Sequence, residues 1–195
     1  IMIDSYELMR PSIESTDVGR EFGFESGSYA VVTLHRPSNV DASNIASDLV
    51  ATLIRLARDV PLVFAVHPRT RKNLTSFGLL EKLEAAPGVH LSEPMSYIRF
   101  MSLVRDARLI ITDSGGLQEE STYLNIPCIT LRPNTERPIT ICQGTNRLAQ
   151  PEDVGRLVDE ILSNQWQNGV RPTLWDGHTA ARIVDDLARR MGVTP

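Results

Sequence analysis

An apolar run that passes straight into a glycine-containing helix signal lies near the middle of the chain, at Leu109-Ile110-Ile111-Thr112-Asp113-Ser114-Gly115-Gly116-Leu117-Gln118-Glu119-Glu120. It predicts a buried strand over Leu109–Thr112 and a helix that begins at Gly115. Each Gly in a helix costs roughly 1 kcal/mol relative to Ala, so two glycines in the first turn indicate that something approaches the backbone closely. Unpaired N–H groups at a helix N-terminus favour phosphate. Tight packing of the helix on the sheet explains the glycines equally well.

Three other predicted strands also end in polar residues. Tyr29–Leu34 is followed by His35-Arg36-Pro37, Leu62–Val66 by His67-Pro68-Arg69, and Cys128–Leu131 by Arg132-Pro133-Asn134. In an open parallel sheet the carboxyl ends of the strands share one edge, and ligands bind outside that edge. We therefore expect two His, several Arg, a Ser and two Gly to lie together, which outlines a site for a polyanion.

Strand and helix signals alternate along the chain, which predicts an α/β fold with a doubly wound, mostly parallel sheet and helices on both faces. The expected strands are Ser28–Leu34, Pro61–Val66, Gly88–Leu91, Leu109–Thr112, Pro127–Leu131 and Asn146–Ala149. The expected helices are Met2–Ile13, a segment over Ile45–Ala57, Arg69–Phe77, Tyr97–Val104, Gly115–Leu124, Glu152–Leu162 and His178–Arg190.

Some boundaries carry a specific expectation. Pro11 is expected to close the first helix, and Pro37 to prevent a helix directly after the first strand. Asn39 or Asp41 is expected to cap the helix that follows. The stretch Arg132–Thr145 is interpreted as one long irregular loop, and such a loop in a compact domain is usually functional.

Composition narrows the class of protein. The length of 195 residues suits one domain, and a net charge of -4 with scattered basic residues argues against a nucleic-acid partner. No apolar run is long enough for a membrane span and no signal-peptide pattern is present, so we expect a cytoplasmic protein without a membrane partner. Cys128 and Cys142 are expected to be buried, reduced thiols. Because the chain begins at Ile1, we expect it to be a piece of a longer protein.

The four histidines differ in their sequence context. His35 follows a strand next to Arg36, where an imidazole can neutralise a departing phosphate or shuttle a proton; a role in capping or packing is the alternative. His67 repeats the arrangement one unit later and is assigned mainly to loop structure. His90 and His178 lie outside the expected edge. No metal site is expected, because the histidines lack matching carboxylate or Cys spacing.

Three further residues have both a functional and a structural interpretation. Glu120, in the second helical turn, can accept hydrogen bonds from a sugar diol, or it is a solvated surface residue. Phe100 can pack against a base, or it belongs to the core stripe that starts at Tyr97. Arg137 can clamp a phosphate with two hydrogen bonds, or it forms a weak surface pair with Glu136.

Several stretches, taken in order, resemble the C-terminal half of the non-hydrolysing UDP-N-acetylglucosamine 2-epimerases. They are Val32–Asp41, Val66–Thr70, Thr112–Glu120, Arg132–Pro138, Trp175–Gly177 with Ala180–Ile183, and Met2–Asp4. The resemblance spans essentially the whole chain. It implies a GT-B architecture, in which two Rossmann-like domains face each other across a cleft and residues 1–195 form the single UDP-binding domain.

The resemblance also implies roles for individual residues. They are Ser114, Gly115 and Gly116 on the diphosphate, Glu120 on the ribose hydroxyls, Phe100 and Met95 on the uracil, His35 on the departing UDP, and Arg137 and Arg36 on the phosphates or sugar. Met95 stands where the family often has a polar residue. The implied reaction interconverts UDP-GlcNAc and UDP-ManNAc by eliminating UDP to a 2-acetamidoglucal and adding it back, without a metal or redox cofactor. Such isomerases serve cell-surface polysaccharide biosynthesis, and the full-length enzyme is implied to be a homodimer.

The residues themselves indicate that the expected site lacks a catalytic base. Abstraction of a carbon-bound proton needs a positioned base, and beyond Glu120 and Glu136 the expected edge offers no pair of carboxylates. In the family the acid–base carboxylates belong to the first domain, which is missing here, so we expect this chain to bind UDP weakly and to turn over nothing alone. A GT-B glycosyltransferase, a hydrolysing epimerase and a non-catalytic nucleotide-sugar sensor remain as alternatives. The whole interpretation depends on bare main-chain amides at the helix start near Gly115 that bind a diphosphate. UDP bound elsewhere, or a neighbouring side chain that plugs this helix start, would contradict it.

Overall fold

A computed structural model describes residues 1–192 and contains one six-stranded sheet in which every pairing is parallel. Its strands are β1 Ala30–Thr33, β2 Leu62–Ala65, β3 Val89–Ser92, β4 Leu109–Thr112, β5 Cys128–Leu131 and β6 Asn146–Ala149. Their order is β3-β2-β1-β4-β5-β6, so the chain starts at the centre, builds outward to β3, and returns to the other side of β1. The doubly wound prediction is confirmed, and the reversal between β1 and β4 creates the crevice at which such sheets bind ligands.

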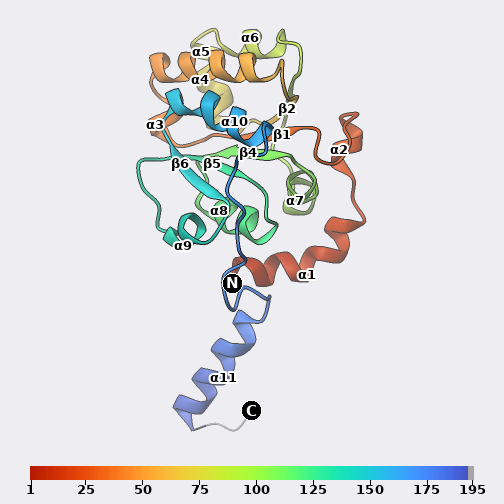
Figure 1. Cartoon of the computed structure of the whole chain (residues 1–195), viewed down its shortest axis with the longest axis vertical. Helices are drawn as coiled ribbons and strands as arrows, with labels where there is room; N and C mark the ends of the chain where they lie inside the picture. Colours follow the sequence, from red (N-terminus) through yellow and green to blue (C-terminus); the bar gives the residue numbers. More distant parts are fainter. Residues whose placement is uncertain (193–195) are drawn as a thin grey trace.

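Helices cover both faces of this sheet (Figure 1). One face carries α3 Pro37–Val40, α4 Ser43–Leu56, α5 Pro68–Ser76, α6 Leu80–Glu84 and α10 Val154–Leu162, the last preceded by the short 3-10 helix Pro151–Asp153. The other carries α1 Met2–Glu14, α2 Val18–Glu21, α7 Tyr97–Arg105, α8 Gly115–Tyr123 and α9 Pro138–Cys142. No helix within residues 1–192 is long and apolar enough to cross a membrane.

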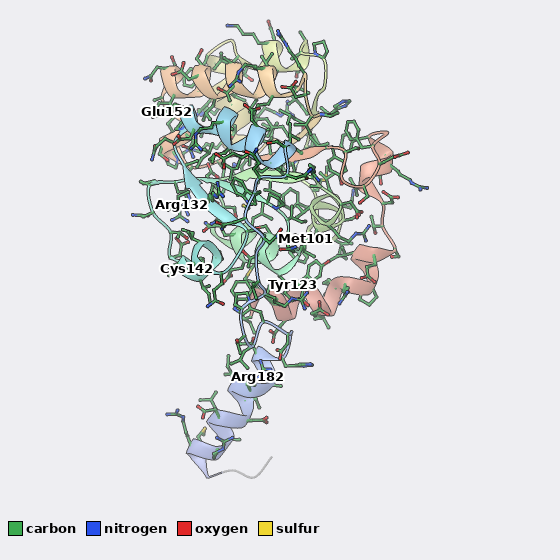
Figure 2. All side chains as sticks on the ribbon, viewed as in Figure 1. Met101, Tyr123, Arg132, Cys142, Glu152 and Arg182 are labelled. Atoms are coloured by element: carbon green, nitrogen blue, oxygen red, sulfur yellow. The ribbon has the colours of Figure 1, made fainter. Side chains whose placement is uncertain are left out.

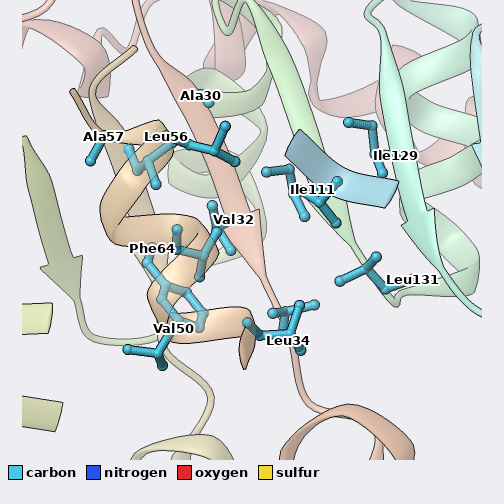
Figure 3. Close-up of a cluster of buried hydrophobic side chains, with 14 of the residues drawn as sticks. Ala30, Val32, Leu34, Val50, Leu56, Ala57, Phe64, Ile111, Ile129 and Leu131 are labelled. Carbon is cyan, nitrogen blue, oxygen red and sulfur yellow. The ribbon is translucent and has the colours of Figure 1, made fainter. Parts of the chain in front are cut away.

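The strands divide their side chains between two hydrophobic clusters, one on each face. In β1, Ala30 and Val32 point into the cluster beneath α4 and α10, whereas Val31 points into the cluster beneath α7 and α8. Figure 3 shows the first cluster, with Val32 between Phe64 and Ile111. This period-two alternation, apolar on both sides, explains why the central strands appear in the sequence as continuous apolar runs.

Two expectations based on proline are wrong. Pro11 does not close the first helix, because α1 runs on to Glu14 and its last turn is anchored by the fully buried Ile13. Pro37 does not prevent a helix either. It is the first residue of α3, a position where the missing N–H has no helical partner to lose. The residue that caps α4 is Ala42, not Asn39 or Asp41, because Asn39 lies within α3 and its side chain serves the site described below.

Three details in the second half of the chain also differ from expectation. The stretch Arg132–Thr145 is not wholly irregular, since it contains α9. Cys128 is buried as expected, which raises the pKa of its thiol to about 11, but Cys142 is exposed. The final helix, α11 Thr179–Met191, extends away from the body of the molecule (Figure 1), and its apolar residues Ile183, Val184, Leu187 and Met191 are exposed rather than packed on the sheet.

Candidate functional site

A fully buried carboxylate organises the edge of the sheet where β4 ends. Asp113 Oδ2 accepts hydrogen bonds from the backbone N–H groups of His35 and Arg36 at 3.0 and 2.9 Å and from Asn39 Nδ2 at 3.0 Å. Arg36 Nε in turn donates to the backbone oxygen of Asp113 at 2.8 Å. Burial raises the pKa of Asp113, but these hydrogen bonds outweigh burial and hold it below its usual value. Asp113 is therefore an ionised anchor that fixes the loop after β1.

The same carboxylate orients the imidazole of His35. His35 Nδ1 lies 2.9 Å from Asp113 Oδ1, so the Nδ1 proton points at the carboxylate and Nε2 is left for a ligand. The His67 ring lies beside it, with 5.5 Å between ring centroids. His67 caps α5, and its Nδ1 accepts from Arg69 N at 3.2 Å, which confirms the assignment of His67 to loop structure. His90 contacts the rings of Phe22 and Phe24, in agreement with a packing role.

The backbone turns from β4 into α8 at the residues next to this anchor. Ser114 N donates to Thr112 Oγ1 at 3.0 Å, and Ser114 is the N-cap of α8 without a capping hydrogen bond from its hydroxyl. The hydroxyl is therefore not committed to the helix. Gly115 and Gly116 form the first turn as expected. A methyl group on Gly116 would meet only the flexible end of Met2, at 3.1 Å.

The start of α8 is covered by an acidic side chain, contrary to the expectation that it lies open. A methyl group on Gly115 would lie 2.6 Å from Glu136 Oε1 and 3.7 Å from Arg132 Nη1. Glu136 Oε2 also pairs with Arg132 Nη2 at 2.7 Å, and this hydrogen bond holds the pKa of Glu136 at about 2. The group at the helix start is thus itself an anion. It is also half exposed, at 47 % of its side chain, so it is not locked in place by packing.

Arg137 does not pair with Glu136. Its Nε lies 3.1 Å from Glu119 Oε1 on α8. The segment before it is held by Gln118, a buried side chain on α8 whose Oε1 accepts from the Thr135 hydroxyl at 2.6 Å and whose Nε2 donates to Ser114 O at 3.1 Å. The loop after β5 is therefore fastened to the first turns of α8, which keeps Arg137 at the same edge as the two glycines.

Glu120 is neither a surface residue nor free. Only 5 % of it is exposed, and its Oε1 accepts a hydrogen bond from the Tyr97 hydroxyl at 2.9 Å. Burial raises the pKa of Glu120 to about 7, a rise that the Tyr97 hydrogen bond opposes and the charge of Glu119 reinforces. A carboxyl group that titrates near neutrality in a buried place is a common sign of a functional site.

Met95 and Phe100 flank Tyr97 in the sequence, before and within α7. Both side chains are half-buried against the second hydrophobic cluster. In the helical stripe, Met101 and Val104 are fully buried, so Phe100 lies at the boundary between core and surface. An aromatic ring in that position retains a face that can contact a ligand.

Four contributors were not singled out from the sequence as site residues: Asp113, Asn39, Gln118 and Arg132. Asp113 could have been predicted, since a carboxylate directly after a buried strand either accepts hydrogen bonds from nearby donors or lies at the exposed edge of the sheet. Gln118 carried a weaker signal, as a polar residue on the buried side of a helix. Nothing local marked Asn39, because its partners Asp113 and Leu131 lie far away in the sequence. Arg132 was noted only as a polar strand end, although its partner Glu136 is four residues away. Within residues 1–192, no cluster of three His, Cys, Asp or Glu could hold a metal ion.

The family model described as UDP-N-acetylglucosamine 2-epimerase matches residues 1–188 of the chain. The chain belongs to this family. The UDP-N-acetylglucosamine 2-epimerase of Methanococcus maripaludis is 42% identical over 163 residues, which is 80% of this chain and 43% of that protein. The crystal structure of the Methanocaldococcus jannaschii epimerase in complex with UDP-GlcNAc and UDP is 34% identical with a TM-score of 0.79, over 95% of this chain and 53% of that one.

The epimerase-family chain thus spans about half the length of the relatives it matches. The same fold also occurs outside the family. Escherichia coli heptosyltransferase WaaC with ADP superposes with a TM-score of 0.52 at 15% identity over 70% of this chain and 45% of that chain, a likeness of fold alone. The α/β fold expected from the sequence, of the kind found in GT-B proteins, is confirmed.

Proposed function

We propose that the chain is the C-terminal, UDP-binding half of an enzyme that interconverts UDP-GlcNAc and UDP-ManNAc in the cytoplasm. The observation that carries the proposal is the unit formed where β1 and β4 end: the helix start at Ser114–Gly116 directly follows Asp113, and Asp113 holds His35 through Nδ1. A helix start offers N–H donors and positive potential to a diphosphate, and an oriented imidazole beside it can carry the charge of a leaving phosphate. The related M. jannaschii protein has been crystallised with UDP-GlcNAc and UDP.

The remaining residues fit around the same nucleotide. Glu120, when ionised, accepts hydrogen bonds from both ribose hydroxyls, and Phe100 and Met95 supply an apolar surface for the uracil. Arg137 and Arg36 add positive charge at the diphosphate. Contacts within the chain hold Glu120 through Tyr97, Arg137 through Glu119 and Arg36 through Asp113, so these three side chains are positioned before a ligand arrives.

In the proposed reaction, the UDP-binding half stabilises the departing UDP. A base removes the proton from carbon 2, the electrons form a double bond between carbons 1 and 2, and the bond from carbon 1 to the phosphate oxygen breaks to release UDP. Protonated His35 stabilises that phosphate oxygen and is held in place by Asp113. Addition of UDP with a proton on the opposite face of carbon 2 completes the inversion. We assign the base to a part of the full-length enzyme outside residues 1–195, so these residues alone are expected to bind UDP weakly and to catalyse nothing.

Replacement of His35 by Ala tests this assignment. In a full-length epimerase that carries this half, we expect His35→Ala to lower turnover by about 10²–10⁴ while UDP affinity changes little, because the helix start and Glu120 remain. Turnover is measured as the formation of UDP-ManNAc in a coupled assay, and UDP affinity is measured by calorimetry. The exposed His178→Ala is the matched control.

Unchanged turnover in His35→Ala would remove His35 from the mechanism. The reaction products also distinguish this proposal from the alternative functions. Stable transfer of the sugar to an added acceptor would indicate a glycosyltransferase, and irreversible release of free ManNAc with UDP would indicate a hydrolysing epimerase.

A further inference from the structure

Arg132 lies directly after β5 (Figure 2). It is a buried cation with half of its guanidinium unused. Its side chain is only 9 % exposed. Nη2 pairs with Glu136 at 2.7 Å, whereas Nη1 is buried without a hydrogen-bond partner among residues 1–192. A buried donor without an acceptor is costly, and the cost is larger for a charged group. Such a group indicates that an acceptor is missing from the structure.

The position of that donor points to the start of α8. A methyl group on Gly115 would lie 3.7 Å from Arg132 Nη1, so the guanidinium borders the same space as the first amides of the helix. Two independent features that favour an anion therefore meet there: the helix N-terminus and the planar fork of an Arg, which matches phosphate oxygens in pairs. A helix start alone would not identify a ligand, but a buried, half-paired Arg beside it does.

The Glu136 carboxylate can move away from the start of α8. Its carboxylate fills the space over Gly115, yet 47 % of its side chain is exposed and it sits on the loop before α9. Rotation about its own side-chain bonds carries it into solvent, whereas the buried Arg132 has no such freedom. Exchange of one anion for another keeps Arg132 paired in both states, so the exchange does not leave a buried charge alone.

We infer that Arg132 is a further phosphate-binding residue of this site and that Glu136 is an internal anion which the nucleotide's phosphate displaces. The inference rests on the proposed function, since it presumes that the anion at α8 is the diphosphate of a UDP compound. Its consequence is quantitative: a site that is open one time in about ten binds its ligand about tenfold more weakly than an open site. The opposite interpretation, in which Glu136 only holds Arg132 in place for UDP, predicts the opposite sign.

Calorimetric titration of the 195-residue chain with UDP at low salt distinguishes the two interpretations. Glu136→Gln is expected to tighten UDP binding about fivefold to tenfold, and Arg132→Met to weaken it about tenfold or more. In the double variant, Glu136→Gln gives no gain, because Arg132 no longer holds the internal anion. Glu84→Gln, an exposed residue on α6, is the control for loss of one negative charge. Thermal unfolding of each variant checks the fold, and Arg132→Lys replaces Arg132→Met if the latter does not fold.

Equal or weaker UDP binding by Glu136→Gln overturns the inference, and so does unchanged binding by Arg132→Met. Gly115→Val, which places a side chain over the helix start, separates this failure from that of the proposed function. If Gly115→Val abolishes UDP binding while Glu136→Gln has no effect, the site stands and the exchange fails. If Gly115→Val binds UDP as well as the wild type, the proposed site itself is wrong.

Discussion

Replacement of Glu120 by Gln is expected to make the fold more stable at about pH 8 and, at the same time, to weaken UDP binding about tenfold or more. The reason for the first effect is the raised pKa of Glu120, about 7 in the folded chain against 4.5 as its ordinary value. Between these two values the folded chain keeps a proton that the unfolded chain releases, so stability falls as the pH rises through this window. Above about pH 7 the full cost applies, about 3 kcal/mol at most.

Gln is neutral at every pH, so the variant escapes this cost while its oxygen still accepts from Tyr97. We expect the free energy of unfolding to exceed that of the wild type by about 1–3 kcal/mol at about pH 8, and to differ little at about pH 5. UDP binding weakens because an amide cannot accept from both ribose hydroxyls. For the same reason, wild-type UDP affinity rises with pH through about 7. Urea unfolding and calorimetry at both pH values provide the test, with Glu81→Gln as the control, and equal stability of wild type and variant at about pH 8 would contradict the account.

Replacement of Asp113 by Asn is expected to lower the free energy of unfolding by about 2–4 kcal/mol at neutral pH. Oδ2 accepts from three donors, namely the N–H groups of His35 and Arg36 and the amide of Asn39. An Asn side chain must keep its oxygen there, which places its NH2 against Nδ1 of His35. The imidazole then accepts at Nδ1 and carries its proton on Nε2, and the doubly protonated ring that Asp113 favours is no longer stabilised.

The pH dependence of this effect has a definite sign. The pKa of Asp113 is lower in the folded chain than its ordinary value of 3.8, so its stabilising contribution is fully present above about pH 4 and is lost as the pH falls further. Urea unfolding at neutral pH measures the loss, and the nitrogen chemical shifts of His35 report the tautomer. The exposed Asp59→Asn serves as the control. A variant as stable as the wild type, with Nδ1 still protonated, would show that Asp113 does not organise the site.

The fold could be predicted from the sequence because its four central strands β1, β2, β4 and β5 are largely apolar on both faces. Leu109–Thr112 and the more polar edge strand Asn146–Ala149 were placed at their observed bounds, and parallel pairing followed from the alternation with helices. The errors arose where tertiary contacts override local rules. Pro11 lies inside α1 because Ile13 is buried beyond it, and Asn39 is drawn from a capping role to a carboxylate 74 residues away.

The site was predictable to the extent that strand ends carry it. His35, Ser114 and the glycines were expected together, and Asp113 joins them. The partner choices were not predictable: Glu136 pairs with Arg132 instead of Arg137, and Arg137 pairs with Glu119. Local sequence contains no information on which of several neighbouring acids and bases the folded loop brings into contact. The burial of Glu120, which raises its pKa, and its hydrogen bond from Tyr97 on α7 both arise from tertiary packing.

A crystal structure of the chain grown with UDP tests the central claim most directly. The account predicts the diphosphate on the amides of Ser114, Gly115 and Gly116, the ribose hydroxyls on Glu120, and Glu136 turned into solvent with Arg132 paired to a phosphate oxygen. UDP bound at another place, or bound while Glu136 still covers Gly115, would contradict it.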